Sequence, residues 1–128
     1  MDSPDSIAAQ QIAQAARAFE QQRTGHVPLS VSVVLNEDTL VITLRGALSP
    51  AEKALAGNPK SAAQLQELHR QLFAVASGPL RREIERIVGV KVCEATAEIE
   101  TIAGTIVQVF LLAGRAGTQT WSDGPTDV

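Results

Sequence analysis

Four segments rich in β-branched residues predict the strands of this chain. They are residues 29–35, 39–45, 90–100 and 105–112. The first two flank Asn36-Glu37-Asp38, whose side chains are typical of turns, and the last two flank a turn that ends at Gly104. In the second segment every other residue is large and apolar: Leu40, Ile42 and Leu44. The pattern predicts two antiparallel β-hairpins.

Helical spacing fills the segments before and between these hairpins. Residues 5–23 carry a weak apolar stripe and end before Gly25. Ser49-Pro50-Ala51-Glu52 has Ser at the N-cap, Pro at the first helical position and Glu at the third. This capping box predicts a short helix over residues 50–56. The stripe of the first helix consists of Ala8, Ile12, Ala15 and Phe19.

The longest helix is predicted between residues 61 and 88. Ser61 and Gln64 repeat the capping pattern at its start, and Gly89 ends it. Ser77-Gly78-Pro79 breaks or kinks this helix, because proline lacks the N–H and strains the preceding turn. The expected core stripe of its first half consists of Leu65, Leu68, Leu72 and Ala76, and Phe73 and Val75 widen it.

These elements predict an α+β fold in the order α-β-β-α-α-β-β, with an antiparallel four-stranded sheet and helices on one of its faces. Residues 1–113 form a single domain, and the Gly-, Thr- and Asp-rich residues 114–128 form a flexible C-terminal tail. The last strand is apolar on both faces except for Gln108, so both faces of the sheet need a cover. Either the N-terminal helix or a second copy of the chain covers the second face, and we expect a homodimer.

The amino-acid composition limits which partners and which cellular compartment we expect for this protein. The chain has 128 residues, a net charge of −3, 3% aromatic residues and no Tyr. This argues against a nucleic-acid partner, which would require a basic field and stacking aromatic side chains. A single cysteine excludes an intrachain disulfide and suits a reducing cytoplasm. No apolar run approaches the roughly 20 residues that span a bilayer, and the acidic N-terminus does not resemble a secretory signal. We expect a cytoplasmic protein with no membrane span.

Residues that could carry chemistry are sparse. His26 and His69 have no second ligand at metal-binding spacing, and we interpret His69 as part of a polar helix surface. Cys93 shares a predicted strand face with Ala95 and Ala97, which indicates core packing rather than a reactive thiol. We therefore expect no enzymatic activity, no catalytic residues, no metal and no cofactor.

Charged residues group on two predicted surfaces. Glu94, Glu98 and Glu100 alternate along one strand face, where we expect a solvated surface. A cation site is disfavoured because hard cations need oxygens that converge from several elements. The run of residues 81–86 places opposite charges three and four positions apart, as on an exposed helix face.

Three segments of the chain form a further pattern: residues 40–53, which contain the motif Ser49-Pro50-Ala51-Glu52-Lys53, then Leu72-Phe73, and then residues 80–92, which end in Glu85-Arg86-Ile87-Val88-Gly89-Val90-Lys91-Val92. In these segments the chain resembles the MpsC-like family. The likeness extends from about Ile12 to Leu112. The family is named after one component of a Na⁺-translocating membrane-potential-generating system. The resemblance implies a soluble accessory subunit for membrane transport of sodium or inorganic carbon, with membrane-embedded partners and no known catalytic residues.

Two functional hypotheses follow. The first is a non-enzymatic accessory or regulatory subunit, held at the membrane through a protein partner, and the alternative is a small-molecule or anion-binding sensor. Arg45 and Lys53 bracket the turn that leads into the capping box, so Arg45, Glu52 and Lys53 are the candidate binding residues. The competing interpretation is structural, in which Glu52 only completes the capping box and Lys53 is solvated.

Overall fold

The computed structural model describes residues 4–115. The predicted tail lies outside the described residues from position 116 onward. The elements follow one another as α1 (Pro4–Thr24), β1 (Ser30–Asn36), β2 (Thr39–Arg45), α2 (Pro50–Ala56), α3 (Pro59–Ala76), α4 (Gly78–Val88), β3 (Val92–Glu100) and β4 (Thr105–Leu112). The predicted α+β class is confirmed, and the predicted kink at Ser77 separates α3 from α4.

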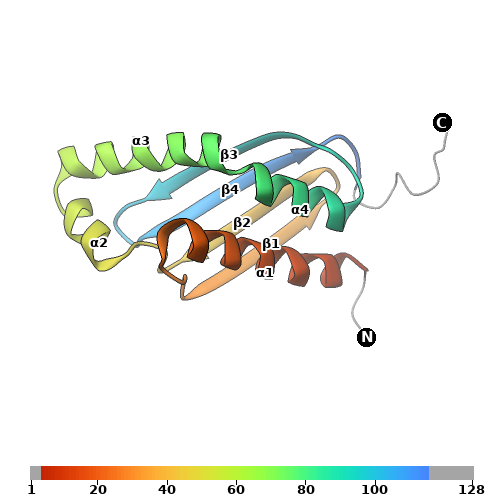
Figure 1. Cartoon of the computed structure of the whole chain (residues 1–128), viewed down its shortest axis with the longest axis horizontal. Coiled ribbons are helices and arrows are strands. Elements are labelled where there is room, and N and C mark those ends of the chain that lie inside the picture. Colours follow the sequence, from red (N-terminus) through yellow and green to blue (C-terminus); the bar gives the residue numbers. More distant parts are fainter. Residues whose placement is uncertain (1–3, 116–128) are drawn as a thin grey trace.

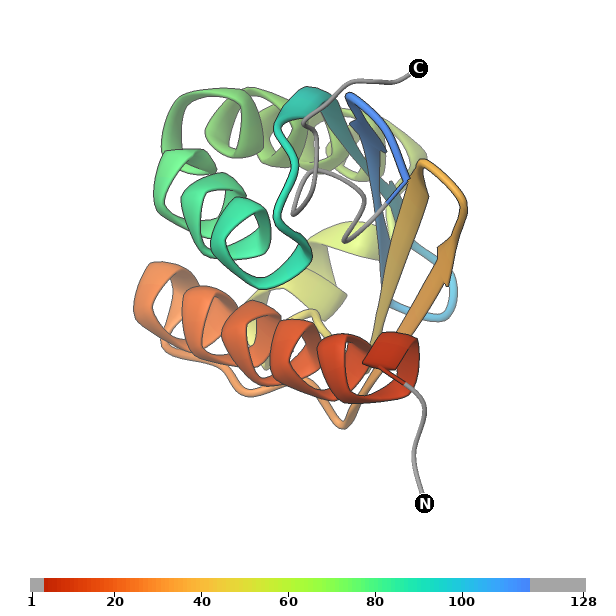
Figure 2. The same ribbon diagram turned by 90° about the vertical axis from the view of Figure 1, so that its right-hand side faces the viewer.

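The four strands form one antiparallel sheet in the order β1-β2-β4-β3 (Figure 1). Each hairpin contributes an edge strand and a central strand, and the two hairpins join through β2 and β4, where Ile42 lies opposite Gln108. All four helices of the described chain lie on the same side of this sheet (Figure 2). These residues therefore form two layers, with the core between helices and sheet.

The alternation in β2 explains the core. Leu40, Ile42 and Leu44 are fully buried against the helices, and Ile106 and Phe110 of β4 lie beside them. Burying a side chain of this size contributes roughly 2 kcal/mol to folding. From the helical layer, Phe73 of α3 contacts Phe110 edge to face, with ring centroids 5.9 Å apart. The helices are thereby attached to the central strands.

The first helix closes the layer beside β1. It packs against β1 and α4, and Ile12 and Ala16 are completely buried. Gly25 follows the helix with a φ of 76°, a conformation that favours glycine, and its N–H bonds to the carbonyl of Gln21. Helix α1 therefore lies on the covered side of the sheet, and the expectation that it could cover the second face is wrong.

The start of α3 differs from the predicted capping by Ser61. Asn58 is the N-cap, and its side-chain oxygen accepts hydrogen bonds from the backbone N–H groups of Lys60 and Ser61. Pro59 at the first helical position favours this earlier start, because its fixed φ suits a helix and its missing N–H needs no partner there. The short helix α2, in contrast, is capped by Ser49 as predicted.

The buried face of α3 is rotated from the predicted stripe. The residues that enter the core are Leu65, His69 and Phe73, whereas Leu68 is 50% exposed and Leu72 is also exposed. The prediction followed hydropathy and placed His69 on the surface, and this placement is wrong. A polar ring can take the core position because it has a partner there, which is described below.

Cys93 is exposed, so its predicted core placement is wrong. The pairing of β3 with β4 shifts between Val92 and Glu94, which leaves Cys93 as the extra residue of a β-bulge. Beyond the bulge, alternation resumes and Ala97 and Ile99 face the core. An irregular register of this kind is not encoded in the alternation of the sequence.

The second face of the sheet carries no helix of residues 4–115, and we call it the open face (Figure 2). Its central strands present half-buried Val41, Thr43, Val107 and Val109, and Val34 of β1 is 60% exposed. The rim at β3 is acidic, with outward-facing Glu94, Glu98 and Glu100. No helix in the described part of the chain is long and apolar enough to cross a membrane.

Candidate functional site

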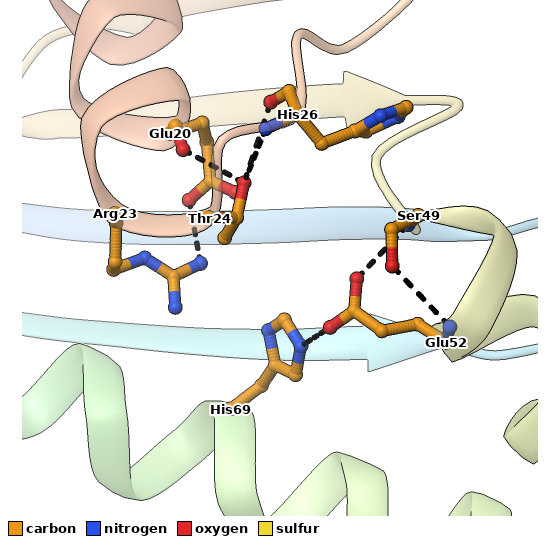
Figure 3. Close-up of polar contacts among 7 residues, drawn as sticks. All are labelled: Glu20, Arg23, Thr24, His26, Ser49, Glu52 and His69. Carbon is orange, nitrogen blue, oxygen red and sulfur yellow. Dashed lines mark hydrogen bonds and ion pairs between the residues drawn. The ribbon is translucent and has the colours of Figure 1, made fainter.

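Polar side chains gather where three helices meet: the end of α1, the start of α2 and the middle of α3 (Figure 3). We call this group the junction cluster. It consists of Glu20, Arg23, Thr24, Ser49, Glu52 and His69. Glu20 is 1% exposed and His69 is 6% exposed, so the cluster contains buried ionisable groups. Buried groups of this kind need partners.

The capping box of α2 supplies the first part of the junction cluster. The Ser49 hydroxyl oxygen accepts a hydrogen bond from the Glu52 backbone N–H at 3.3 Å, and Glu52 Oε1 accepts one from the Ser49 backbone N–H at 2.9 Å. Pro50 holds the first helical position. The two hydrogen bonds fix the Glu52 carboxylate against the helix start, so its second oxygen can point toward α3.

The Glu52 carboxylate binds His69 across the gap between α2 and α3. His69 Nε2 donates to Glu52 Oε2 over 2.6 Å. Both oxygens of Glu52 are thus occupied, one by the cap and one by the imidazole (Figure 3). This bridge explains how α3 tolerates a histidine at a core position, and it joins the two helices through polar side chains.

The pKa of Glu52 lies below its ordinary value. Partial burial acts in the opposite direction and raises the pKa, because it disfavours the charged form. The backbone hydrogen bond from Ser49, the hydrogen bond from His69 and the electrostatic attraction to that ring outweigh burial. The carboxylate is therefore held in its ionised form.

The end of α1 supplies the second part of the junction cluster. Arg23 Nη2 donates to Glu20 Oε1 over 2.8 Å, and the guanidinium lies 5.7 Å from the centre of the Phe19 ring. The Thr24 hydroxyl donates to the Glu20 carbonyl over 2.8 Å. Glu20 Oε2 and Arg23 Nε are buried and have no hydrogen-bond partner among residues 4–115. Within those residues the cluster retains one unused acceptor and one unused donor.

A cavity of about 220 Å³ opens onto the junction cluster. Its lining residues are Arg23, Thr24, Ser49, Glu52, Leu68, His69 and Leu72. The two exposed leucines give it an apolar side, and the cluster gives it a polar side. A cavity with this lining could hold a small molecule with one apolar and one polar end.

The junction cluster has a carboxylate–imidazole pair, but its hydroxyl group is not hydrogen-bonded to the imidazole. The Ser49 hydroxyl interacts with the Glu52 backbone and not with the His69 ring. Acyl-transfer chemistry needs a nucleophile hydrogen-bonded to its base. No group of three or more metal-ligating side chains converges in the described part of the chain.

His26 lies in the loop next to the junction cluster and has a separate role. Its Nε2 donates to the Gly46 carbonyl over 2.9 Å, and its backbone N–H donates to the Thr24 hydroxyl over 3.1 Å. These bonds attach the α1–β1 loop to the turn that leads into α2.

The structure separates the three predicted binding residues. Glu52 belongs to the junction cluster. Arg45 lies on the open face and donates to the Ser32 hydroxyl over 3.0 Å. Lys53 is exposed and lines a different hollow, beside Gly57 and the β3–β4 turn. The binding role of each residue stays a prediction, but they do not form one site.

Sequence reasoning missed four members of the junction cluster: Glu20, Arg23, Thr24 and His69. For the two most buried of them, His69 and Glu20, a signal exists in the helical spacing. Leu65, His69 and Phe73 are four residues apart, and Ile12, Ala16 and Glu20 repeat the same interval on α1. Both buried polar residues therefore continue an apolar stripe at helical spacing. The partner of His69 comes from another helix, whereas Glu20 pairs with Arg23 in the next turn of its own helix.

A larger hollow lies at the other end of the sheet and differs in character. It has a volume of about 740 Å³ and is lined by Arg82, Glu85, Arg86, Gly89, Val90, Lys91, Ala113 and Gly114. Its cationic side chains are exposed, and the Glu85 carboxylate accepts a hydrogen bond from the Val92 backbone N–H. None of these lining residues is a buried ionisable group. The smaller cavity at the junction cluster is therefore the better candidate for a specific site.

Residues 4–115 thus form a small two-layer α+β domain with a polar cluster at the junction of three helices. The family described as "Na+-translocating membrane potential-generating system (MpsC)" matches residues 6–114. The chain belongs to this family. It is also 24% identical over 102 residues to the uncharacterized protein YbcI of Bacillus subtilis (strain 168), a match that covers 80% of this chain and 82% of that protein. No solved structure matches the chain.

Proposed function

We propose that the chain is a non-enzymatic accessory or regulatory subunit of a membrane system that transports ions or inorganic carbon. In this role it is a cytoplasmic homodimer, held at the membrane through a membrane-protein partner. The family description, which refers to Na⁺ translocation and a membrane potential, supports the transport context. Both oxygens of Glu52 are engaged by the helix cap and by His69, which supports a structural or binding role for the junction cluster rather than catalysis.

The open face is the observation that carries the homodimer in this proposal. Antiparallel sheets can expose one face to water, but that face is then usually polar, whereas Val41, Val107 and Val109 lie at the centre of the open face. Such apolar, β-branched side chains favour contact with another sheet or helix. Helix α1 packs on the other side, so the cover within this proposal is a second copy of the chain.

Oligomeric state tests the homodimer. We expect the unmodified chain to be a dimer by light scattering after size-exclusion chromatography, and Val41→Lys to be a folded monomer. Val75→Lys is the matched control, because Val75 is 85% exposed on α3, away from the sheet. A monomeric unmodified chain at high protein concentration contradicts the homodimer.

Purification from native membranes tests the partner. We expect the tagged chain to be recovered with a membrane protein after mild detergent extraction, and the recovery to persist after high-pH washes only while that protein is present. A chain recovered solely as a free dimer in the soluble fraction contradicts the accessory role.

A small-molecule or anion-binding sensor is the second candidate. Arg23, whose buried Nε has no hydrogen-bond partner among residues 4–115, lines the cavity of about 220 Å³, and this favours the sensor. A ligand that binds the folded chain raises its melting temperature in proportion to the logarithm of its concentration. We expect a shift with at least one small anion or carboxylate in a metabolite panel, and a smaller shift in Leu72→Gln. Lys53→Gln is the control outside the cavity. No shift across the panel contradicts the sensor.

A further inference from the structure

We infer that the second copy packs on the open face about a two-fold axis parallel to the strands, so that Arg45 of each protomer faces the acidic rim of the other. This inference rests on the proposed homodimer and goes further, because it assigns the symmetry of the interface and a role for Arg45.

The charges on the open face are divided between its two edges. The β3 edge presents Glu94, Glu98 and Glu100, and the opposite edge strand, β1, presents Ser30, Ser32, Val34 and Asn36. The cation on the β1 side is Arg45, which lies opposite Ser30 in the ladder. At the β3 edge Arg70 of α3 pairs with Glu98, and the Glu100 carboxylate accepts hydrogen bonds from the backbone N–H groups of Ile102 and Ala103. Three carboxylates against one guanidinium leave this edge acidic, and the other edge is neutral with one cation.

Two face-to-face arrangements of identical sheets keep the strands of the two copies aligned about a two-fold axis in the interface. An axis perpendicular to the strands places β3 against β3 of the second copy, so three glutamates of one protomer face the same three of the other. An axis parallel to the strands places β3 against β1 of the second copy. Like charges across an interface are unfavourable, and opposite potentials favour and orient association. The charge distribution therefore selects the parallel axis.

The apolar residues at the centre of the open face also agree with a two-fold axis parallel to the strands. The sheet order β1-β2-β4-β3 puts the parallel axis between β2 and β4. Val41 and Val109 are direct neighbours across that axis in one protomer. The two-fold rotation then stacks Val41 on the second copy's Val109, and Thr43 on its Val107. Sheets packed in this way lie about 10 Å apart, with β-branched side chains filling the gap.

Arg45 is available for an intermolecular contact. Its guanidinium donates to the Ser32 hydroxyl, and it forms no ion pair with a carboxylate among residues 4–115. It lies one step beyond the Leu44–Ile106 pair, in line with the pair of Thr105 and Glu100. The parallel axis brings this row onto the same row of the second copy, with Arg45 near the glutamate rim.

Cross-linking between two differently tagged chains tests the axis. All variants carry Cys93→Ser, because Cys93 is exposed and would react. Ser32 and Glu98 are the two ends of one row across the open face, through Thr43 and Val107. We expect a short bifunctional maleimide to join a Ser32→Cys chain to a Glu98→Cys chain. We expect no product between two Glu98→Cys chains.

The outcomes separate this inference from the proposed homodimer. Products between two Glu98→Cys chains, without the mixed product, mean a dimer with a perpendicular axis and overturn the inference alone. Products between two Ser32→Cys chains alone mean that β1 lies against β1 of the second copy and also overturn it. No product together with a monomer in light scattering overturns the homodimer as well.

Charge reversal tests Arg45. We expect Arg45→Glu to weaken dimerisation roughly tenfold in sedimentation equilibrium at low salt, and the loss to shrink as salt is added. Arg17→Glu, at an exposed cation on α1, is the matched control and should leave the dissociation constant unchanged. Equal effects of the two variants, or none in either, overturn the role of Arg45.

Discussion

The two faces of the sheet are built from the same strands, yet helices cover one of them and not the other. On the covered face, Leu40, Ile42 and Leu44 pack beneath helices and are completely removed from water. On the open face, alternate residues of the same strands present valines at the centre and glutamates at the β3 rim. The comparison shows that alternation defines two faces, whereas the helices decide which of them becomes the core.

The carboxylates on the two sides show the same contrast. Glu52 and Glu98 both bind neighbouring residues of α3, the first His69 and the second Arg70. The Glu52–His69 pair lies within the helical layer, whereas Arg70 and Glu98 lie in solvent. The Arg70 guanidinium beside Glu98 lowers the pKa of that carboxyl, as the cap and His69 do for Glu52. In both pairs a neighbouring side chain lowers the pKa of a carboxyl group. Breaking the Glu52–His69 pair within the helical layer should nevertheless cost more stability than breaking the exposed Glu98–Arg70 pair.

The largest expected loss of stability distinguishes the covered face of the sheet from the open face. Ile42→Ala should lower the free energy of unfolding by about 3 kcal/mol, because it leaves a cavity under the helices, whereas Val41→Ala on the open face should cost less than about 1 kcal/mol. Urea denaturation at low protein concentration, where self-association is negligible, measures both. Equal losses for the neighbouring residues would break the comparison.

Removal of the bridge between α2 and α3 should have the next largest effect. Glu52→Ala removes the capping box and leaves His69 buried without its acceptor, so we expect a loss of about 2 kcal/mol in the free energy of unfolding. Lys53→Ala, one residue along the same helix, should change it by less than about 0.5 kcal/mol. A loss of similar size in both variants would assign the effect to helix propensity instead.

Lowering the pH should reproduce, in the unmodified chain, part of the stability loss expected for Glu52→Ala. Since the pKa of Glu52 is lower in the folded chain than in the unfolded chain, the unfolded chain binds the proton more tightly. The stabilisation is present above the unfolded pKa and is lost as pH falls through the folded pKa. The stability advantage over Glu52→Gln should therefore shrink across this acidic range in a series of denaturation curves. A constant difference at all pH values would show that the cap does not depend on the charge.

The smallest effect is expected at the solvated pair on the β3 rim. Glu98→Gln removes the ion pair with Arg70 but leaves both side chains in water, so the melting temperature of the monomer should stay within measurement error. Arg70 retains Glu67 of its own helix as a partner. A loss as large as that of Glu52→Ala would mean that exposure does not distinguish the two carboxylates.

Local patterns in the sequence predicted most of the fold. The strand segments 39–45 and 105–112 coincide with β2 and β4, because alternation and turn residues are local signals. The capping box at Ser49 was also predictable, since all of its members lie within four residues. The bulge at Cys93 was not, because its register depends on β4. The rotation of α3 was also missed, because hydropathy favours Leu68 and Leu72 over His69.

The junction cluster was predicted only in its capping-box members, Ser49 and Glu52. His69 and Glu20 interrupt apolar stripes, and sequence alone gives no reason to bury an imidazole or a carboxylate. Their partners come from another helix, in the case of His69, or from the next turn of the same helix, in the case of Glu20. The cavity beside His69 exists only because residues of α1, α2 and α3 converge there.

The sequence by itself determined the secondary structure, the two hairpins and the start of α2, because these depend on contacts between residues close together in the chain. The tertiary structure alone decided that α1 lies on the same face as the other described helices, that His69 is a core residue and that Arg45 and Glu52 lie apart. The physical reason is burial. Whether a polar group can be buried depends on a partner brought from elsewhere in the chain, and local patterns carry no information about that partner.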